Sequence, residues 1–259
     1  MKVTSPDRNS SLFVGSVAKA FRILAAFDMG QRALPLVQIA ALSDLDVSAA
    51  QRAVYTLVAL GYLRKDASTR LYSLTPKILN LGTSYLRAEG LAGRATPYIR
   101  KANEEAVETI SLLELEGTDV IHVIRYGAPG SINVRILMGS RSPAYTQAGG
   151  RAILTFMPAD AAAARIDEIR YEPLTKFTVK SREDLEAHLA QIKADGYAIV
   201  EQEHSIDEVS LAAPIFAPNG TAIASVSFQV PVSRWAEPRH QQRLIRIVLD
   251  TANAISAQT

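Results

Sequence analysis

Arg52 and Tyr55 are the side chains in this sequence whose types and spacing best suit contact with DNA. They lie three residues apart in the segment 45–62, where apolar residues recur at helical spacing on the opposite side. An arginine can donate two parallel hydrogen bonds to a guanine edge or to a phosphate. The sequence therefore predicts a helix that enters a major groove, and the alternative is an ordinary solvated helix face.

The start of this helix leaves two roles open for Gln51. Ser48 followed three residues later by Gln51 matches a capping box, so we expect the helix to begin at Ser48. A capping Gln51 would bond within the helix, whereas a DNA-reading Gln51 would point outward. The predicted DNA face comprises Ser48, Ala49, Gln51, Arg52 and Tyr55.

The neighbouring segments favour the DNA interpretation. Ser16 can cap a first helix, Pro35 can open a second one, and residues 43–46 form a tight turn into the DNA-facing helix. Apolar and polar residues then alternate on both sides of a polar turn at 66–69, which is typical of a β-hairpin. A hairpin at this place predicts the wing of a winged helix-turn-helix. The side chains of this wing that would face the DNA phosphates are Arg64, Lys65, Ser68, Thr69 and Arg70. The alternative is that they are ordinary soluble turn residues.

Composition is consistent with a DNA-facing front joined to a different rear domain. Residues 1–70 hold nine Lys and Arg against five Asp and Glu, whereas the whole chain of 259 residues has a net charge of only +2. There is no cysteine, hence no disulfide or zinc-thiolate site. We find no apolar signal core and no run of about 18 apolar residues, so we expect a cytoplasmic protein with no membrane partner.

The rest of the chain predicts an α+β protein in four parts. Residues 1–14 are expected to be a flexible arm, 15–75 the DNA-binding domain, 76–92 a linker helix and 93–259 a sensor-like domain. The linker carries several leucines that need a partner, which predicts a homo-oligomeric contact. In the rear domain, strands at 112–115, 120–125, 132–137, 197–200, 209–216 and 222–229 are expected to pack against helices that include 159–170 and 182–195.

From about Ser16 onward, the chain resembles the IclR family of bacterial transcriptional regulators. SVAKAFRILAAF is similar to the family's first helix, and LDVSAAQRAVYTLVALGYLRKD to its recognition helix and wing entry, with Arg52 at the family's arginine. RLYSLTPKILNLG resembles the wing exit and linker, and AGGRAIL, GYAIVEQEH, LAAPIF and ASVSFQVP resemble segments of the rear domain. The resemblance implies a winged helix-turn-helix joined to a GAF-like effector-binding domain, acting as a homodimer or tetramer on double-stranded operator DNA.

The resemblance also implies a small organic acid as effector. Gly149 and Gly150 begin a helix, where bare N–H groups suit a carboxylate, although close packing would equally explain two glycines. The effector residues expected in this way are Met138, Ala148, Gly149, Gly150, Val200, Ser210, Ser227 and Gln229. Departures from the family pattern include Asp44 and Asp207 where glycine is common, and Arg151 in place of lysine.

Enzyme functions find little support. The sequence has no G-x-S-x-G, H-E-x-x-H, Walker A or G-x-G-x-x-G pattern, and its four histidines lack metal-ligand spacing. Glu201, Glu203 and His204 could form a carboxylate–imidazole pair, more readily structural than catalytic. We therefore expect a ligand-responsive DNA-binding regulator with no catalytic residue, metal or cofactor; the alternative is a protein-interaction or sensor module with little specific DNA binding.

Overall fold

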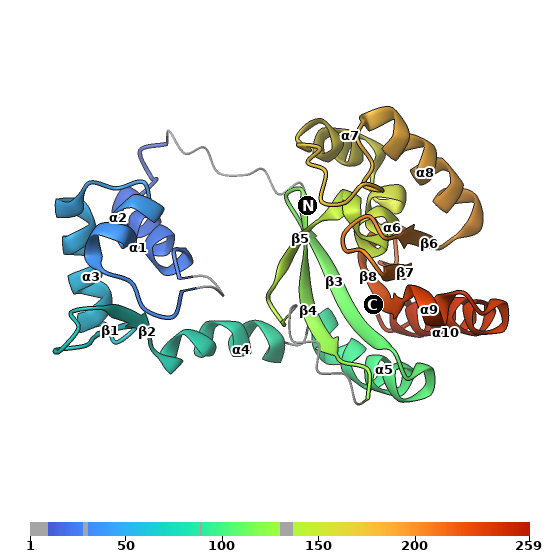
Figure 1. The fold of residues 1–259 in the computed structure, drawn as a ribbon, viewed down its shortest axis with the longest axis horizontal. Helices are drawn as coiled ribbons and strands as arrows, with labels where there is room; N and C mark the ends of the chain where they lie inside the picture. The colour runs from blue at the N-terminus through green and yellow to red at the C-terminus, as the bar shows by residue number, and fades with distance from the viewer. Residues whose placement is uncertain (1–9, 28–30, 89, 130–136) are drawn as a thin grey trace. The chain divides into compact units, whose positions relative to one another are not determined.

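The computed structural model describes residues 10–27, 31–88, 90–129 and 137–259. The chain divides into two compact units, Met1–Leu86 and Arg87–Thr259, which Figure 1 colours from blue to teal and from green to red. No helix in the described ranges is long and apolar enough to cross a membrane.

The N-terminal unit is a winged helix-turn-helix, as the sequence predicts (Figure 1). Helices α1 (Gly15–Ala25), α2 (Leu36–Leu42) and α3 (Val47–Ala59) precede the antiparallel strands β1 (Leu63–Lys65) and β2 (Tyr72–Leu74). Each element contributes apolar side chains to one core, as does the segment between α1 and α2. That core contains Ile23, Leu34, Ile39, Val54, Leu57, Leu63 and Tyr72.

The turn into α3 corrects the expected start of that helix. Asp44 adopts a left-handed backbone with φ of 51°, which aspartate tolerates better than most residues. The Asp46 side chain then accepts a hydrogen bond of 2.8 Å from the Ala49 N–H, so α3 begins at Val47. The predicted capping box of Ser48 and Gln51 is therefore wrong, because a carboxylate two residues earlier already caps the helix.

A six-stranded antiparallel sheet forms the centre of the C-terminal unit. Its strand order is β5-β4-β3-β8-β7-β6, so the two edges are β5 and β6. The strands are β3 (Thr109–Glu116), β4 (Asp119–Tyr126), β5 (Arg141–Pro143), β6 (Ala198–Glu201), β7 (Glu208–Phe216) and β8 (Ala222–Pro231).

Helices cover both faces of this sheet (Figure 1). One face carries α6 (Ala148–Phe156), with α7 (Ala159–Asp167) and α8 (Arg182–Asp195) packed beyond it. The other carries α5 (Leu91–Ala106) and α10 (Pro238–Ser256), with the short α9 (Val232–Trp235) beside α10. Side chains towards α5 and α10 are uniformly apolar and buried: Ile110, Leu112, Leu211, Ile215, Val226 and Phe228. The face towards α6 is different in kind, and it is described below.

Element boundaries differ from the predictions at several places. The predicted linker helix is a 3-10 turn, Pro76–Ile78, followed by α4 (Leu79–Arg87). Helix α5 begins at Leu91 and continues through Pro97. The predicted strand at 132–137 lies almost entirely outside the described residues, and the short β5 was not predicted.

Candidate functional site

The outward face of α3 carries the predicted DNA-reading side chains. Ser48, Gln51, Arg52 and Tyr55 are exposed, with 76% of Tyr55 accessible, whereas Ala49 is half-buried. Because Asp46 caps the helix, the Gln51 amide is not needed there. The structure therefore places all four exposed side chains on one accessible helical surface, where Gln51 is available to an external partner.

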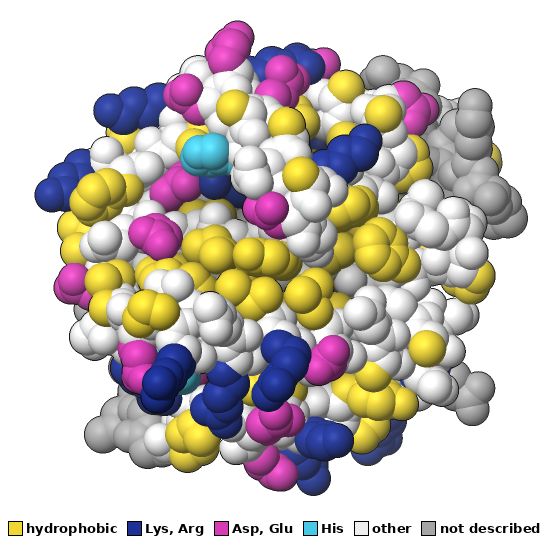
Figure 2. Space-filling view, turned by 90° about the vertical axis from the view of Figure 1, so that its right-hand side faces the viewer, with side chains coloured by type: hydrophobic (Ala, Val, Ile, Leu, Met, Phe, Trp, Pro, Cys, Tyr) yellow, Lys and Arg dark blue, Asp and Glu magenta, His cyan; other side chains and the backbone are white. Residues whose placement is uncertain are grey.

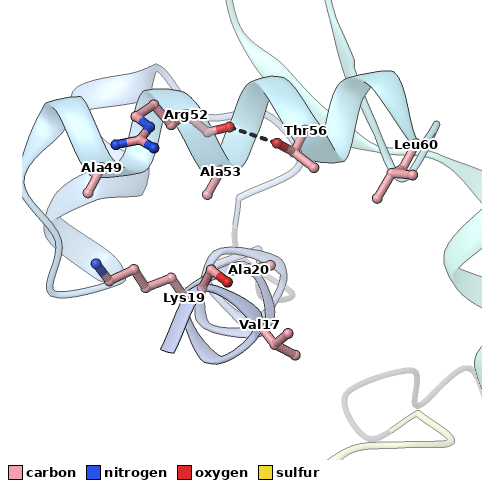
Figure 3. Close-up of a pocket in the computed structure, with 9 residues that line it drawn as sticks. Val17, Lys19, Ala20, Ala49, Arg52, Ala53, Thr56 and Leu60 are labelled. Atoms are coloured by element: carbon pink, nitrogen blue, oxygen red, sulfur yellow. Dashed lines mark hydrogen bonds between the residues drawn. The ribbon is translucent and has the colours of Figure 1, made fainter. Parts of the chain in front are cut away.

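A groove of about 540 Å³ separates α3 from α1 and adds a residue that the sequence did not single out. Lys19 of α1 and Arg52 of α3 both line it. Figure 3 shows the two side chains on facing helices, each extending towards the Ala49 end of α3. Helical spacing alone did not indicate Lys19, because this exposed lysine lies only one turn before the buried Ile23 on α1. Two cations at one end of the groove suit a phosphate backbone.

The wing is built by an aspartate-centred turn. Asp66 Oδ1 accepts hydrogen bonds from the Ser68 and Thr69 N–H groups and from the Ser68 hydroxyl, and these bonds lower the pKa of Asp66 to about 2. Arg70 closes the turn in a left-handed conformation, with φ of 58°. The Ser68 hydroxyl therefore has its proton engaged within the wing.

The wing's three cationic side chains are exposed. Arg64 donates from Nε to the Ser73 hydroxyl at 2.9 Å, and the Lys65 ammonium lies 5.4 Å from the centre of the Tyr72 ring. Both cations keep further donors for an external acceptor. The wing residues named from the sequence thus share one exposed hairpin, although Ser68 and Thr69 are partly engaged in forming it.

The second candidate site is a buried polar part of the α6-facing side of the large sheet, beside an apolar cluster that includes Leu113, Val120 and Ala212. Pairing places Gln229 beside Thr109 and Ser210, and Ser227 beside Ser111, on adjacent strands. Ser111, Ser210, Ser227 and Gln229 are each at most 5% exposed. A row of buried hydroxyl and amide groups on a sheet is costly unless each is hydrogen-bonded, so a bound polar partner is the expected reason for it.

Several polar atoms here have no hydrogen-bond partner among the described residues. They belong to neighbouring strands and to the segment that enters α6, and leaving each one unpaired costs about 1–3 kcal/mol. The atoms are His122 Nε2, both amide atoms of Gln147, the Ser225 and Ser227 hydroxyls, and Gln229 Nε2. Together they offer donors and acceptors to a small polar molecule or to water.

Arg125 brings a positive charge to this cluster. Its Nη1 donates to Gln229 Oε1 at 2.7 Å and to the Ser111 hydroxyl at 3.1 Å. Partial burial lowers the pKa of Arg125, and the nearby Glu208 carboxylate opposes that shift. Three of its five N–H donors are not accounted for by these bonds, so the guanidinium can still bind an anionic group.

His122 is held neutral beside this cation. Burial, together with the positive charges of Arg125 and His204, lowers the pKa of His122 to about 3. Its Nδ1 lies 3.2 Å from the Ser111 hydroxyl. Sequence reasoning missed Ser111, His122, Arg125, Gln147 and Ser225, because strand pairing between distant segments is what brings them together.

The predicted glycines serve packing. A Cβ on Gly149 would lie 2.4 Å from Leu113 Cδ1, and one on Gly150 would lie 2.2 Å from the Ala144 carbonyl oxygen. Both glycines therefore allow α6 to approach its neighbours closely. This agrees with close packing, the alternative to carboxylate binding that the sequence left open. The Ala148 N–H donates to the Ser210 hydroxyl at 3.1 Å, so these two predicted residues do meet.

Of the two large apolar residues expected at the effector site, Val200 and Met138, the structure buries only Val200. Val200 is buried beside Ser210 in the strand pairing. Met138 is 54% exposed in a turn next to Gly139, so the structure does not bring it into the buried polar face.

The carboxylate–imidazole pair that Glu201, Glu203 and His204 could have formed is not present among these described residues. Glu203 Oε2 accepts from Arg151 Nη2 at 2.6 Å and from the Val179 N–H at 2.9 Å. His204 instead lies 3.2 Å from the Thr146 hydroxyl. The partner of the Glu203 carboxylate is the buried guanidinium of Arg151 on α6. The two residues are distant in the sequence, so sequence proximity could not indicate this pair.

Comparison with known proteins identifies the family. Residues 83–257 match the model of the C-terminal domain of the bacterial transcriptional regulator IclR, and residues 16–67 match the IclR helix-turn-helix domain. The chain belongs to the IclR family. Its members are DNA-binding transcriptional regulators and not enzymes.

Relatives span almost the whole chain. The Pca regulon regulatory protein of Pseudomonas putida is 30% identical, over 99% of this chain and 90% of that protein. The solved structure of a regulator from Rhodococcus sp. RHA1 is 32% identical, has a TM-score of 0.81, and covers 94% of this chain and 97% of its own. An IclR homologue from Microbacterium hydrocarbonoxydans, solved with 4-hydroxybenzoate, has a TM-score of 0.79 at 21% identity, covering 93% of this chain and 98% of its own.

Proposed function

We propose that this IclR regulator responds to a small carboxylic acid bound at the buried polar face beneath α6. The carrying observation is the group of buried, unpartnered polar atoms beside Arg125. The guanidinium would hold the carboxylate of the acid, because charge-assisted hydrogen bonds are the strongest that this cluster offers. The homologue that was solved with 4-hydroxybenzoate supports an acid ligand for this fold.

The remaining atoms suit hydroxyl or carbonyl groups on the same ligand. Ser225, Ser227 and Gln147 can each donate or accept. Neutral His122 adds no positive charge at its unpartnered Nε2, so the anionic end of the ligand belongs at Arg125. A monoacid with a second polar group fits this division better than a diacid.

Calorimetry with a panel of aromatic hydroxy acids and short keto acids tests the effector proposal. We expect at least one acid to bind the wild-type chain, and Arg125→Met to weaken that binding about 10-fold or more, as the loss of a charge-assisted bond requires. Arg141→Met is the matched control, because Arg141 pairs with Glu116 and Asp119 on an exposed edge. If no acid binds, or if both variants bind equally well, the proposed site is wrong.

We also propose that Arg52 leads DNA recognition, with the other α3 residues and the wing around it. Arg52→Ala should abolish the specific operator shift while the thermal unfolding temperature stays within about 2 °C of wild type, because the side chain is exposed. Arg246→Ala removes an exposed arginine of α10 and should leave the shift intact. Specific binding retained by Arg52→Ala would refute the assignment and favour the protein-interaction alternative.

Operator shifts with and without the acid test whether the two sites are coupled. A bound effector must change operator affinity by the same factor by which the operator changes effector affinity. Helix α4 is the proposed dimer contact, since none of its described residues is buried and Leu79 and Leu81 are exposed. A dimer would place two recognition helices on two half-sites, where a small change in spacing alters affinity.

A further inference from the structure

The open edge of strand β6 is the feature that the proposed function leaves unexplained. The Gln202 N–H donates to the Glu208 carbonyl of the neighbouring chain segment at 2.8 Å. Hydrogen-bonding directions alternate along an antiparallel strand, so Ala198 and Val200 also bond towards β7. The N–H and C=O groups of Ile199 and Glu201 therefore point away from the sheet.

An apolar band follows this edge. A cavity of about 430 Å³ adjoins it. Its apolar lining residues are Phe177, Ile192, Tyr197 and Ile199, and polar and charged side chains line the rest: Arg151, His188, Gln191, Asp195, Glu201 and Glu203. Figure 2 faces the side of the unit where β6, α8 and α10 lie in Figure 1, and it shows hydrophobic side chains crossing the middle of that side between charged rims. Ile206, in the connection between β6 and β7, and Phe177 are also exposed.

The opposite edge of the same sheet is protected, and β6 is not. Strand β5 has only three residues, it ends in Pro143, and its Arg141 pairs with Glu116 and Asp119. Short strands, prolines and charges are the usual means of preventing edge pairing. Strand β6 reads Ala-Ile-Val-Glu, with one charge at its end. Its outward N–H and C=O groups can therefore accept another strand.

We propose that β6 of a second copy of this chain covers the edge, in antiparallel register about a two-fold axis at Ile199. In that register Ile199 faces its own copy, and Tyr197 faces Glu201 of the other chain. The outward N–H and C=O groups of these residues then pair reciprocally, as a two-fold interface requires.

The side chains are compatible with this self-pairing. Apolar Ile199 lies at the axis, and each Tyr197 hydroxyl can donate to the Glu201 carboxylate opposite. Glu201 Oε1 already accepts from Trp235 Nε1 at 3.1 Å, which leaves Oε2 for the tyrosine. No like charges face each other at these positions. A contact between effector-binding units at β6 is separate from the α4 contact proposed above.

Disulfide trapping tests the register directly, because the chain has no cysteine of its own. Ile199→Cys places two thiols across the axis, at a separation that antiparallel pairing brings within disulfide range. Mild oxidation of the full chain should link it into dimers at least 10-fold more than Ile223→Cys, the control at an exposed isoleucine of β8. Equal cross-linking of the two variants would overturn the proposal.

The mass of the assembly provides an independent test. Ile199→Lys should halve the native mass measured by light scattering, because two ammonium groups would face each other at the axis. Ile199→Pro removes an N–H that is not bonded to β7 and should also halve the native mass. Because proline adds no charge, this variant shows whether the effect of the lysine arises from lost strand pairing. If the mass of both folded variants equals that of wild type, another polypeptide covers the edge and the proposed self-pairing is wrong.

Discussion

Replacing Glu203 by alanine tests the buried ion pair that fixes helix α6. The Arg151 and Glu203 side chains are only 1% and 7% exposed, so solvent screens their interaction little. Arg151 also donates to the Tyr145 carbonyl at 2.7 Å and to His188 Nδ1 at 2.8 Å. The guanidinium thus joins α6 to α8 and to two loops, and Glu203 is the carboxylate that balances its charge.

The cost of Glu203→Ala follows from the bonds removed. Two hydrogen bonds to the carboxylate are lost, from Arg151 and from the Val179 N–H, and each is worth about 1.5–3 kcal/mol because one partner is charged. Breaking a buried pair and leaving one ion costs about 3–5 kcal/mol in total. For a unit of this size, about 2–4 °C of unfolding temperature corresponds to each kcal/mol, so the loss should be about 6–20 °C.

Calorimetric unfolding of the full chain measures this loss, with the transition of the C-terminal unit as the readout. Glu186→Ala is the matched control, since Glu186 pairs with Arg182 at 2.7 Å on the surface, where solvent screens the interaction. A Glu203→Ala transition within 2 °C of that control would refute the reasoning that this buried carboxylate holds the network together.

Three further substitutions test separate parts of the structure. Asp46→Ala should destabilise the N-terminal unit by about 0.5–2 kcal/mol in urea unfolding, whereas Gln51→Ala should leave its stability unchanged. If Gln51→Ala were the more destabilising of the two, the capping box of Ser48 and Gln51 would be supported instead. Gly150→Ala should lower the unfolding temperature of the C-terminal unit far more than Gly93→Ala, because the space around Gly93 is open. Burial lowers the pKa of His122 to about 3 in the folded chain, against about 6.5 when unfolded. The unfolded chain therefore binds the extra proton between about pH 6.5 and 3, and the free energy of unfolding falls by about 1.4 kcal/mol for each pH unit lowered through this range. His122→Gln should remove that part of the pH dependence in unfolding titrations, and an unchanged slope would contradict it.

The DNA-binding unit was predictable because its information is local. Helical spacing of apolar residues, a turn at Asp44 and a polar hairpin turn each lie within a few neighbouring residues. The errors concern helix starts. Helix α1 begins at Gly15 after Val14 with no side-chain cap, so the prediction that Ser16 caps it is wrong. The wrong start of α3 arose between two polar candidates two residues apart. Both Asp46 and Ser48 are suitable cap residues, and only backbone geometry decides between them.

The proposed effector site was less predictable because strand pairing assembles it. Ser227 and Ser111 are 116 positions apart in the chain and become neighbours only through the register of β3 with β8. Arg125 lies on β4, and its contact with Gln229 crosses β3. Periodicity within one strand shows which side chains share a face, but it does not show which strands are adjacent. The resemblance to the family indicated Ser210 on β7 and Ser227 and Gln229 on β8, but it did not indicate Ser111 on β3 or Arg125 on β4.

Helix α6 connects the buried ion pair to the proposed effector site. Its Ala148 N–H bonds to Ser210 at the polar face, and one turn later Arg151 binds Glu203, so the first turn is fixed from both sides. A ligand that uses this turn must fit α6 where it stands, since displacing the helix would expose or unpair a buried guanidinium. Preorganised donors of this kind bind without the cost of ordering them. Loss of Glu203 should therefore weaken acid binding as well as stability, although its carboxylate binds Arg151 and not the ligand.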